Sequence, residues 1–169
     1  MTKEELLAVL RLQSIPNIGD VSAKKLIERC GSPEAVFTDT RRQLLQIEGI
    51  GYYTLKNLYD AEHREAAETE YEYIQQNRIE YTYYKDAEHP AYLKHCVDSP
   101  ILLFKRGNMN VADRKIISIV GTRNITSYGR AFCEKFIADI APLDPIIVSG
   151  FAYGVDITAQ RAAIKYGLQ

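Results

Sequence analysis

The chain has 169 residues, of which 46% are hydrophobic and 25% charged, a composition typical of a globular protein that argues against disorder. This length accommodates one ordinary domain or two small ones. The formal net charge of −1 excludes a strong overall basic field for nucleic acid or membrane, although such a total can conceal local patches.

Three further features bear on the compartment. The sequence has no run of about 18 apolar residues that would cross a membrane as a helix, and its acidic start does not match a secretory signal. Three widely spaced cysteines, Cys30, Cys96 and Cys133, suit neither a disulfide framework nor a zinc site, and we expect buried thiols in a reducing cytosol. We therefore expect a cytoplasmic protein with no membrane partner, metal or other cofactor.

The first sixty residues have the pattern of short helices. Apolar residues at helical spacing predict helices beginning near Leu6 and Val21, separated by a turn at residues 15–20. Gly31 should end the second helix, and Pro33 should open a short third helix over residues 34–37.

This region contains an internal repeat. Residues 15–19 (Ile-Pro-Asn-Ile-Gly) return as residues 47–51 (Ile-Glu-Gly-Ile-Gly), and apolar residues at helical spacing follow each copy. The repeat predicts two helix–hairpin–helix units. The turn of such a unit points backbone N–H groups outward at a helix N-terminus, where they can bind a DNA phosphate without reading sequence.

Charge weighs against DNA contact by these hairpins. Residues 1–68 contain nine Lys and Arg side chains against eleven acids, a net charge of −2. Asp20 and Glu48 lie at the two turns, whereas Lys24 and Lys25 could help only the first. We favour a structural or partner-binding role, and DNA contact stays open as the alternative.

The hydrophobic period changes in the second part of the chain. Residues 60–78 predict a connecting helix with a solvated acidic face. Residues 79–84 and 101–104 predict short strands, the second closed by a turn at residues 106–108. Two units of strand, glycine turn and helix follow. The first is expected at residues 116–120, 121 and 127–140, and the second at residues 145–149, 150 and 155–166. This order predicts an α/β fold, in which an all-α helix–hairpin–helix module precedes a Rossmann-like parallel sheet.

The first glycine loop, residues 121–130, follows a strand at the position where open α/β sheets bind ligands. It matches neither the dinucleotide nor the Walker pattern. The hydroxyls of Thr122 and Ser127 and the planar cation of Arg123 suit a phosphodiester, and arginine can also stack on a base. Residues 105–130 hold six Lys and Arg side chains against one acid, Asp113, so a local charge of +5 supports DNA binding.

The second glycine loop, residues 149–160, has no catalytic pattern. We expect Asp156 to cap the following helix, or to orient Ser149 or Arg123, rather than to act as a catalyst. Ser149 is not in a Gly-x-Ser-x-Gly elbow, and all three histidines lie outside the loop, which makes a triad improbable. We therefore expect a protein that is not an enzyme.

Three motifs occur in order along the chain. They are Leu-Phe-Lys-Arg-Gly-Asn at 103–108, Ile-Val-Gly-Thr-Arg at 119–123 with Ser-Tyr-Gly at 127–129, and Val-Ser-Gly-Phe-Ala-Tyr-Gly-Val-Asp at 148–156. Together with the preceding hairpins, they resemble the DNA-processing protein A (DprA/Smf) family over nearly the whole chain. The resemblance implies a bacterial protein that binds and protects single-stranded DNA during natural transformation and loads a RecA-type recombinase. It also implies an extended Rossmann-like domain, often preceded by a sterile-alpha-motif-like (SAM-like) domain, and a homodimer.

The resemblance and the basic window together indicate the DNA-binding residues. In the family pattern the first loop holds DNA phosphate and the second lines the same pocket, while two basic residues come from the window. The expected residues are Gly121, Thr122, Arg123, Ser127, Gly150, Ala152, Gly154, Lys105 and Arg106. Tyr153 and Gln160 stand where relatives commonly have Arg and His, so neither receives a charged role, although Tyr153 could stack on a base.

We expect a helix–hairpin–helix (SAM-like) domain at residues 1–65. Residues 66–169 should form the first part of an extended Rossmann-like domain that binds single-stranded DNA. The family continues through more strands and helices, whereas this sequence ends at Gln169. We therefore expect either a fragment or a shortened gene product, without part of the DNA pocket and dimer surface.

Two other functions stay open. A nucleotide-processing enzyme of the phosphoribohydrolase type would need a Pro-Gly-Gly loop and a nearby catalytic Glu, which this sequence lacks up to residue 169. A helix–hairpin–helix repair glycosylase would need a nucleophilic Lys or an Asp after the second hairpin. Lys56 and Asp60 lie there, without any further match to that class.

Overall fold

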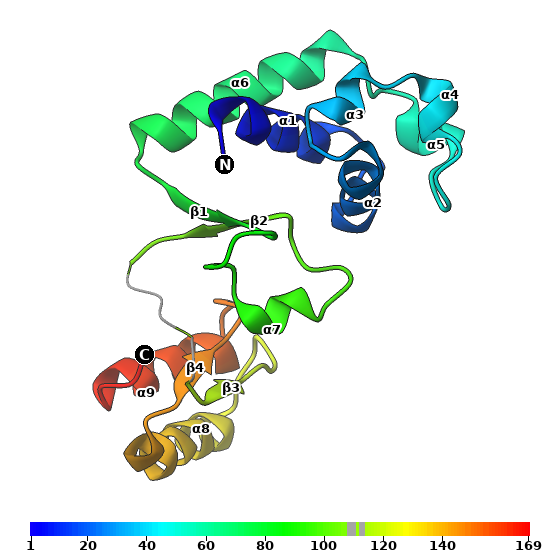
Figure 1. Cartoon of the computed structure of the whole chain (residues 1–169). Helices are drawn as coiled ribbons and strands as arrows, with labels where there is room; N and C mark the ends of the chain where they lie inside the picture. The colour runs from blue at the N-terminus through cyan, green and yellow to red at the C-terminus, as the bar shows by residue number, and fades with distance from the viewer. Residues whose placement is uncertain (108–110, 112–113) are drawn as a thin grey trace. The chain divides into compact units, whose positions relative to one another are not determined.

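Figure 1 shows the computed structural model of the chain, which describes residues 1–107, 111 and 114–169. Asn108 of the expected turn and Asp113 of the basic window lie outside the described residues. The chain divides into two compact units, residues 1–109 and 110–169, and each has its own hydrophobic core. No helix in the described part of the chain is long and apolar enough to cross a membrane.

The first unit begins with five helices, followed by a longer sixth. These are α1 (Lys3–Ser14), α2 (Asp20–Cys30), α3 (Ala35–Thr38), α4 (Arg41–Leu44), α5 (Tyr52–Leu55) and α6 (Ala61–Gln76). Helix α1 begins with a capping box: Glu5 N–H donates to Thr2 Oγ1 (3.1 Å), and Thr2 N–H donates to Glu5 Oε2 (2.6 Å). Helix α2 ends at Gly31, whose N–H donates to Ile27 O, as expected from the sequence.

The repeated turns form two hairpins that pack together. Gly19 and Gly51 are the N-caps of α2 and α5, and both have extended backbone, with ψ of 177° and 174°. Ile18 and Ile50 occupy equivalent positions in the two turns, and both are buried in the core of the unit. Lys25 Nζ donates to Glu48 O (3.2 Å), which links the first hairpin to the second turn. The tandem helix–hairpin–helix module is therefore present.

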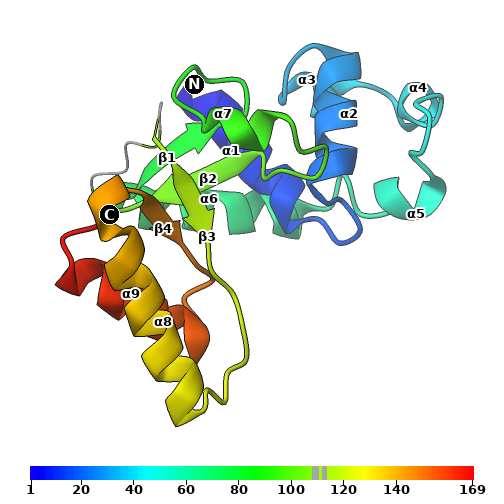
Figure 2. The same ribbon diagram turned by 90° about the horizontal axis from the view of Figure 1, so that it is seen from below.

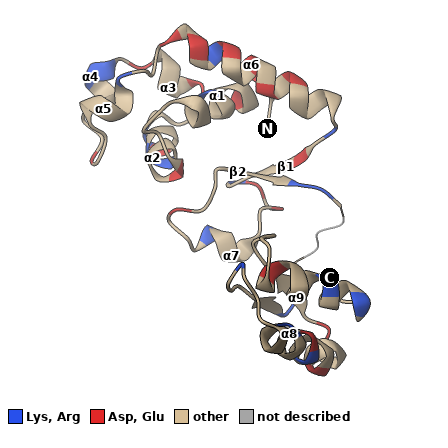
Figure 3. Cartoon of the chain, turned by 180° about the vertical axis from the view of Figure 1, so that it is seen from behind, with Lys and Arg blue, Asp and Glu red and all other residues tan. Residues whose placement is uncertain are grey.

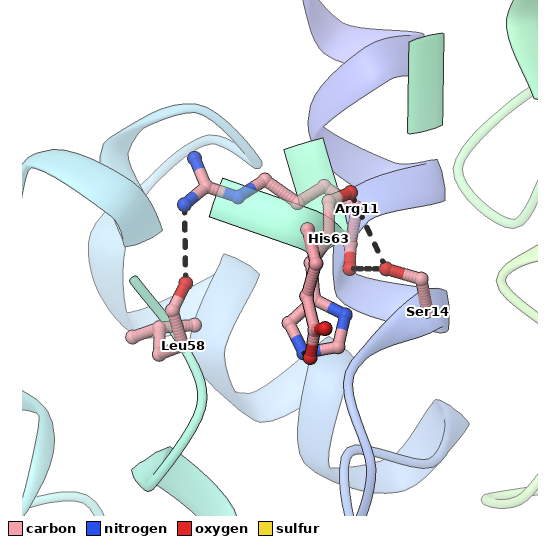
Figure 4. A network of polar contacts seen from close by, with 5 residues as sticks. Arg11, Ser14, Leu58 and His63 are labelled. Atoms are coloured by element: carbon pink, nitrogen blue, oxygen red, sulfur yellow. Dashed lines mark hydrogen bonds and ion pairs between the residues drawn. The ribbon is translucent and has the colours of Figure 1, made fainter. Parts of the chain in front are cut away.

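Helix α6 lies beside α1, as Figures 1 and 2 show, and buries Ala67 and Ile74 in the same core. Its acidic face is exposed, as expected (Figure 3). Figure 4 shows polar contacts that join α1, α6 and the segment before α6. Arg11 Nη2 donates to Leu58 O (3.2 Å), and Ser14 Oγ lies 2.9 Å from Arg11 O and 3.4 Å from His63 O.

A two-stranded hairpin completes the first unit. Strands β1 (Glu80–Tyr83) and β2 (Leu102–Lys105) are antiparallel, with Tyr81 opposite Phe104, and α7 (Ala91–Lys94) lies in the segment between them. Tyr83, Ile101 and Leu102 are buried in the core of the helical module. The core of the first unit therefore extends through the hairpin, because α6 and both strands contribute side chains to it.

The second unit is a small α/β structure. It comprises β3 (Ile116–Ser118), α8 (Ser127–Ile140), the 3-10 helix η1 (Ala141–Leu143), β4 (Ile146–Val148) and α9 (Val155–Lys165). Strands β3 and β4 are parallel, with Ile117 opposite Ile147, which confirms the predicted α/β class. The core lies between the sheet and both helices and includes Cys133, Ile137 and Ala159. Strand β3 is only half-buried, unlike the buried strand expected, because α8 and α9 pack against each other and a parallel sheet is fully buried only where helices cover both of its faces.

The cysteines differ in exposure. Cys133 is buried, Cys30 is half-buried, and Cys96 is exposed, so the expectation of buried thiols is wrong for Cys96. Cys96 follows the short helix α7, where Tyr92 and Val97 are exposed as well, so the hydrophobic core does not extend to it. Burial and a hydrogen bond with Asp39 raise the pKa of Cys30 to about 11, and burial raises the pKa of Cys133.

Candidate nucleic-acid interface

The loop between β3 and α8 is ordered by its own hydroxyl groups. Asn124 N–H donates to Thr122 Oγ1 (3.1 Å), which closes a tight turn around Arg123. Thr126 is the N-cap of α8, and its Oγ1 accepts a hydrogen bond from Gly129 N–H (3.0 Å). The loop therefore leads directly from the sheet into the N-terminus of a fourteen-residue helix.

The loop between β4 and α9 packs against this first loop through its backbone. Gly154 has φ of +86°, and a Cβ added there would lie 2.1 Å from Thr122 O and 2.5 Å from Arg123 O. Val155 N–H donates to Thr122 O (3.1 Å). A Cβ at Gly121 would in turn lie 2.7 Å from Val155 Cγ2. We call these two segments, residues 119–126 and 149–154, the paired glycine loops, since glycine allows their close approach.

Asp156 holds the second of the paired glycine loops in place. Its side chain is buried, and Oδ2 accepts hydrogen bonds from Gly150 N–H (3.1 Å) and Ala152 N–H (3.5 Å). Ser149 Oγ donates to Ile119 O (2.7 Å), at the start of the other loop. Asp156 thus caps the loop that opens α9 and, among the described hydrogen bonds, contacts neither Ser149 nor Arg123.

Exposed cationic and aromatic side chains surround this rigid backbone. Arg123 and Ser127 are exposed, and Arg123 forms no ion pair with any residue that the structure describes. Tyr128, Phe151 and Tyr153 expose 80%, 78% and 84% of their surface, a high fraction for rings. Such rings and a guanidinium suit stacking on unpaired bases.

Phe151 and Tyr128 receive no role from the sequence pattern. The sequence does contain one sign of a binding role for these rings. An aromatic residue inside a polar loop or at a helix start has no apolar neighbours to pack against, so it is not expected to belong to the core. Phe151 also has φ of +58°, which is uncommon for a residue other than glycine and typical of strained functional loops.

Lys105 and Arg106 belong to the first unit, whereas the paired glycine loops belong to the second. Lys105 Nζ lies 4.0 Å from Glu80 and 3.8 Å from Glu88, so its charge is partly compensated. Arg106 is exposed and, with Lys105 and Arg78, borders an open cavity of about 590 Å³. The basic window of the sequence is therefore divided between two units.

The charged residues beside the hairpins have partners within the first unit. Asp20 Oδ1 accepts a hydrogen bond from Ile101 N–H (2.9 Å), and Lys24 Nζ donates to Ser99 Oγ (2.7 Å). Lys25 is held by Glu48 O, as described above. These contacts tie the hairpins to the rest of the unit and favour the structural role over direct DNA contact.

Asp60, which the repair hypothesis singles out, is the N-cap of α6. Its carboxylate and the side chains of Glu62 and His63 have ligand atoms within 4.8 Å of one another, the arrangement in the described residues closest to a metal site. They lie at the N-terminus of α6, where the helix dipole disfavours a cation. Lys56 is exposed in the segment after α5. Neither residue gains support for a catalytic role.

Comparisons with known proteins cover both units. Residues 80–169 match the family model described as DNA recombination-mediator protein A, and residues 9–61 match a SAM-like helix-hairpin-helix tandem. The DNA processing protein DprA of Bacillus subtilis is 38% identical over 79 residues, which are 46% of this chain and 27% of that protein. Its namesake in Streptococcus pneumoniae is 34% identical over 79 residues, 47% of this chain and 28% of that protein.

A solved structure has the same fold. The X-ray structure of DNA processing protein A (DprA) from Streptococcus pneumoniae aligns with a TM-score of 0.72, at 21% identity, over 99% of this chain and 56% of that one. This chain thus spans about half of that structure, and its sequence matches span about a quarter of the curated relatives. Because the family model covers more than half of the residues, the chain belongs to the DNA recombination-mediator protein A (DprA/Smf) family.

Proposed function

We propose that this chain binds single-stranded DNA through the paired glycine loops. The observation that carries the proposal is the exposed guanidinium of Arg123, held on a loop whose backbone packs against Gly154 and Val155. A cation on so constrained a backbone is pre-organised, and binding then costs little conformational entropy. The family, and the name DNA processing protein of its curated members, support DNA as the ligand.

Each group at the loops has a task in such a complex. Arg123 and the hydroxyls of Thr122 and Ser127 bind phosphate oxygens, helped by the N-terminus of α8. The exposed rings of Phe151 and Tyr153 stack on bases, which requires that the bases be unpaired. Gly121, Gly150, Ala152 and Gly154 contribute backbone rather than side chains. This combination recognises single strands without reading their sequence.

The protein acts as a mediator and not as an enzyme. Ser149 donates to a backbone carbonyl, and Asp156 is buried and bound to backbone N–H groups, so both have structural tasks. As in the family pattern, we propose that the complete protein protects incoming DNA in natural transformation. It then loads a RecA-type recombinase and works as a homodimer in the cytoplasm.

The test is binding of fluorescent oligo-dT to the wild-type chain and to Arg123→Ala. The substitution should weaken binding by about 1–3 kcal/mol, because both stacking and a phosphate contact are lost. The logarithm of affinity should fall with the logarithm of salt with a slope of about −0.7 per phosphate contacted. Arg161→Ala serves as the control, since Arg161 is exposed on α9 outside the loops, and should leave affinity nearly unchanged.

Equal affinity of wild type and Arg123→Ala would remove the proposal. Release of free base from a nucleoside monophosphate would instead favour the phosphoribohydrolase class. Preference for duplex DNA, lost on substitution in the two hairpins, would favour a repair protein.

A further inference from the structure

A second cavity, remote in sequence from the paired glycine loops, lies within the first unit. Its volume is about 560 Å³, within the range of small-ligand sites, and it opens between α2 and the segment from Tyr84 to Ser99. Its lining includes the charged and titratable side chains Lys24, Lys25, Glu28, Lys85, His89 and Lys94. We call this space the lysine cavity.

The lysine cavity has an uncompensated positive charge. Its lining has four lysines against one acid, Glu28, which gives a net charge of +3 with histidine neutral. None of the four lysines forms an ion pair with a carboxylate in the described part of the chain. Cations that line one cavity without a counter-ion repel one another, and a bound anion would relieve that repulsion.

Neutral acceptors hold these ammonium groups in place. Lys24 Nζ donates to Ser99 Oγ (2.7 Å) and to Val97 O (3.3 Å). Lys94 Nζ donates to Asp86 O (2.9 Å), and Lys85 Nζ lies 5.4 Å from the centre of the Tyr84 ring. Each ammonium therefore keeps donor capacity for a ligand, because a lysine has three N–H groups.

His89 adds a buried ring nitrogen without a partner. It is 2% exposed, its Nδ1 lies 3.2 Å from Thr82 Oγ1, and its Nε2 has no hydrogen-bond partner in the described residues. Burial, with Lys94 and Lys24 nearby, lowers the pKa of His89 and so favours the neutral ring. When the Thr82 hydroxyl donates to Nδ1, the ring hydrogen is on Nε2, and this N–H lacks an acceptor.

We propose that the lysine cavity is a phosphate-binding site, distinct from the paired glycine loops. Phosphate offers several oxygen acceptors around one centre, which matches several ammonium groups and a buried imidazole that line one cavity. The phosphate belongs either to the backbone of a nucleic acid or to a free phosphate monoester. The site does not depend on DNA binding at Arg123.

The test is an NMR titration of the ¹⁵N-labelled chain with inorganic phosphate, at constant ionic strength maintained with chloride. Backbone amides of α2 and of residues 84–99 should shift and saturate. The double variant Lys85→Gln/Lys94→Gln should bind phosphate at least about tenfold more weakly, since two charge-assisted hydrogen bonds are lost. Both side chains are exposed, so the fold should persist. Lys56→Gln removes one exposed lysine charge outside the cavity and should leave phosphate binding unchanged.

Two further probes identify the source of the phosphate. Saturable shifts with oligo-dT that has 5′-hydroxyl ends assign the cavity to phosphodiesters, whereas shifts with thymidine 5′-monophosphate alone assign it to monoesters. Both responses should persist in Arg123→Ala, so failure of the proposed DNA site and failure of this one are distinguishable. Absence of saturable shifts with inorganic phosphate, or equal weakening by Lys56→Gln, would overturn the inference.

Discussion

Single residues decide the geometry of the paired glycine loops, and Gly154 has the strictest requirement. Its φ of +86° favours glycine, and a Cβ there would overlap the carbonyl oxygens of residues 122 and 123. Gly167 has a similar φ of +73° but nothing within 4 Å of an added Cβ. Comparing a substitution at Gly167 with one at Gly154 therefore distinguishes the cost of backbone strain from the cost of steric overlap within one unit.

Gly167→Ala should destabilise the chain by about 1–2 kcal/mol, the cost of a left-handed conformation. Gly154→Ala adds overlap with backbone atoms and should cost about 2–5 kcal/mol. Urea denaturation of both variants measures the difference in the free energy of unfolding. Equal losses at the two sites would show that the loops separate without cost, which contradicts the close packing described.

Among the elements, strand β1 is joined to the segment that connects it to β2 by a buried polar pair. Thr82 on β1 and His89 before α7 are both 2% exposed, and their side chains contact each other. Burial is the largest cause of the lowered pKa of His89, followed by Lys94 and Lys24, with Asp86 acting in the opposite direction. The unfolded chain therefore binds a proton at this histidine more readily than the folded chain does.

Stability from this group should be fully present above the ordinary histidine pKa of about 6.5 and should fall as the pH drops below it. The free energy of unfolding, measured by urea denaturation near pH 7 and near pH 5, should change less between the two pH values for His89→Gln than for wild type. His95→Gln, which removes an exposed histidine, should keep the wild-type difference. If His89→Gln loses as much stability between pH 7 and pH 5 as wild type does, the buried ring does not control the pH dependence of stability.

At the scale of the whole molecule, two hydrophobic cores form within separate stretches of the chain. One uses residues from Leu6 to Leu102, the other residues from Ile117 to Leu168. The first core includes fully buried Leu26 and Leu58 of the helical module together with Ile101 beside β2. Helices and hairpin are therefore one folding unit, even though the sequence patterns of the two parts differ.

Residues 1–107 should thus fold alone, with helical circular dichroism and a cooperative thermal transition. In this fragment, Leu26→Ala should cost about 2–5 kcal/mol because it leaves a cavity in the core. Tyr53→Ala serves as the control: the ring is 80% exposed, and its loss should change stability by less than about 0.5 kcal/mol. A non-cooperative transition in the fragment would show that its core needs residues beyond 107.

Local patterns predict much of this structure. Helices α1, α2, α8 and α9 and the parallel strand pair lie where apolar spacing and glycine positions place them. These signals depend on neighbouring residues alone: Thr2 and Glu5 form a capping box within one turn. The glycine motifs likewise indicate the family, since the close approach at Gly154 requires that residue type at that position.

The sequence by itself determined the element order, the α/β class, the hairpin repeat and the family. Only the tertiary structure decided which elements share a core and which charges are available. Asp20 contacts Ile101 and Lys24 contacts Ser99, partners 81 and 75 residues away, and no local pattern contains such pairs. The same holds for the basic window, which is continuous in sequence but divided between two units. The reason is physical: periodicity and capping act over a few residues, whereas burial and charge compensation depend on contacts that form only when the chain folds.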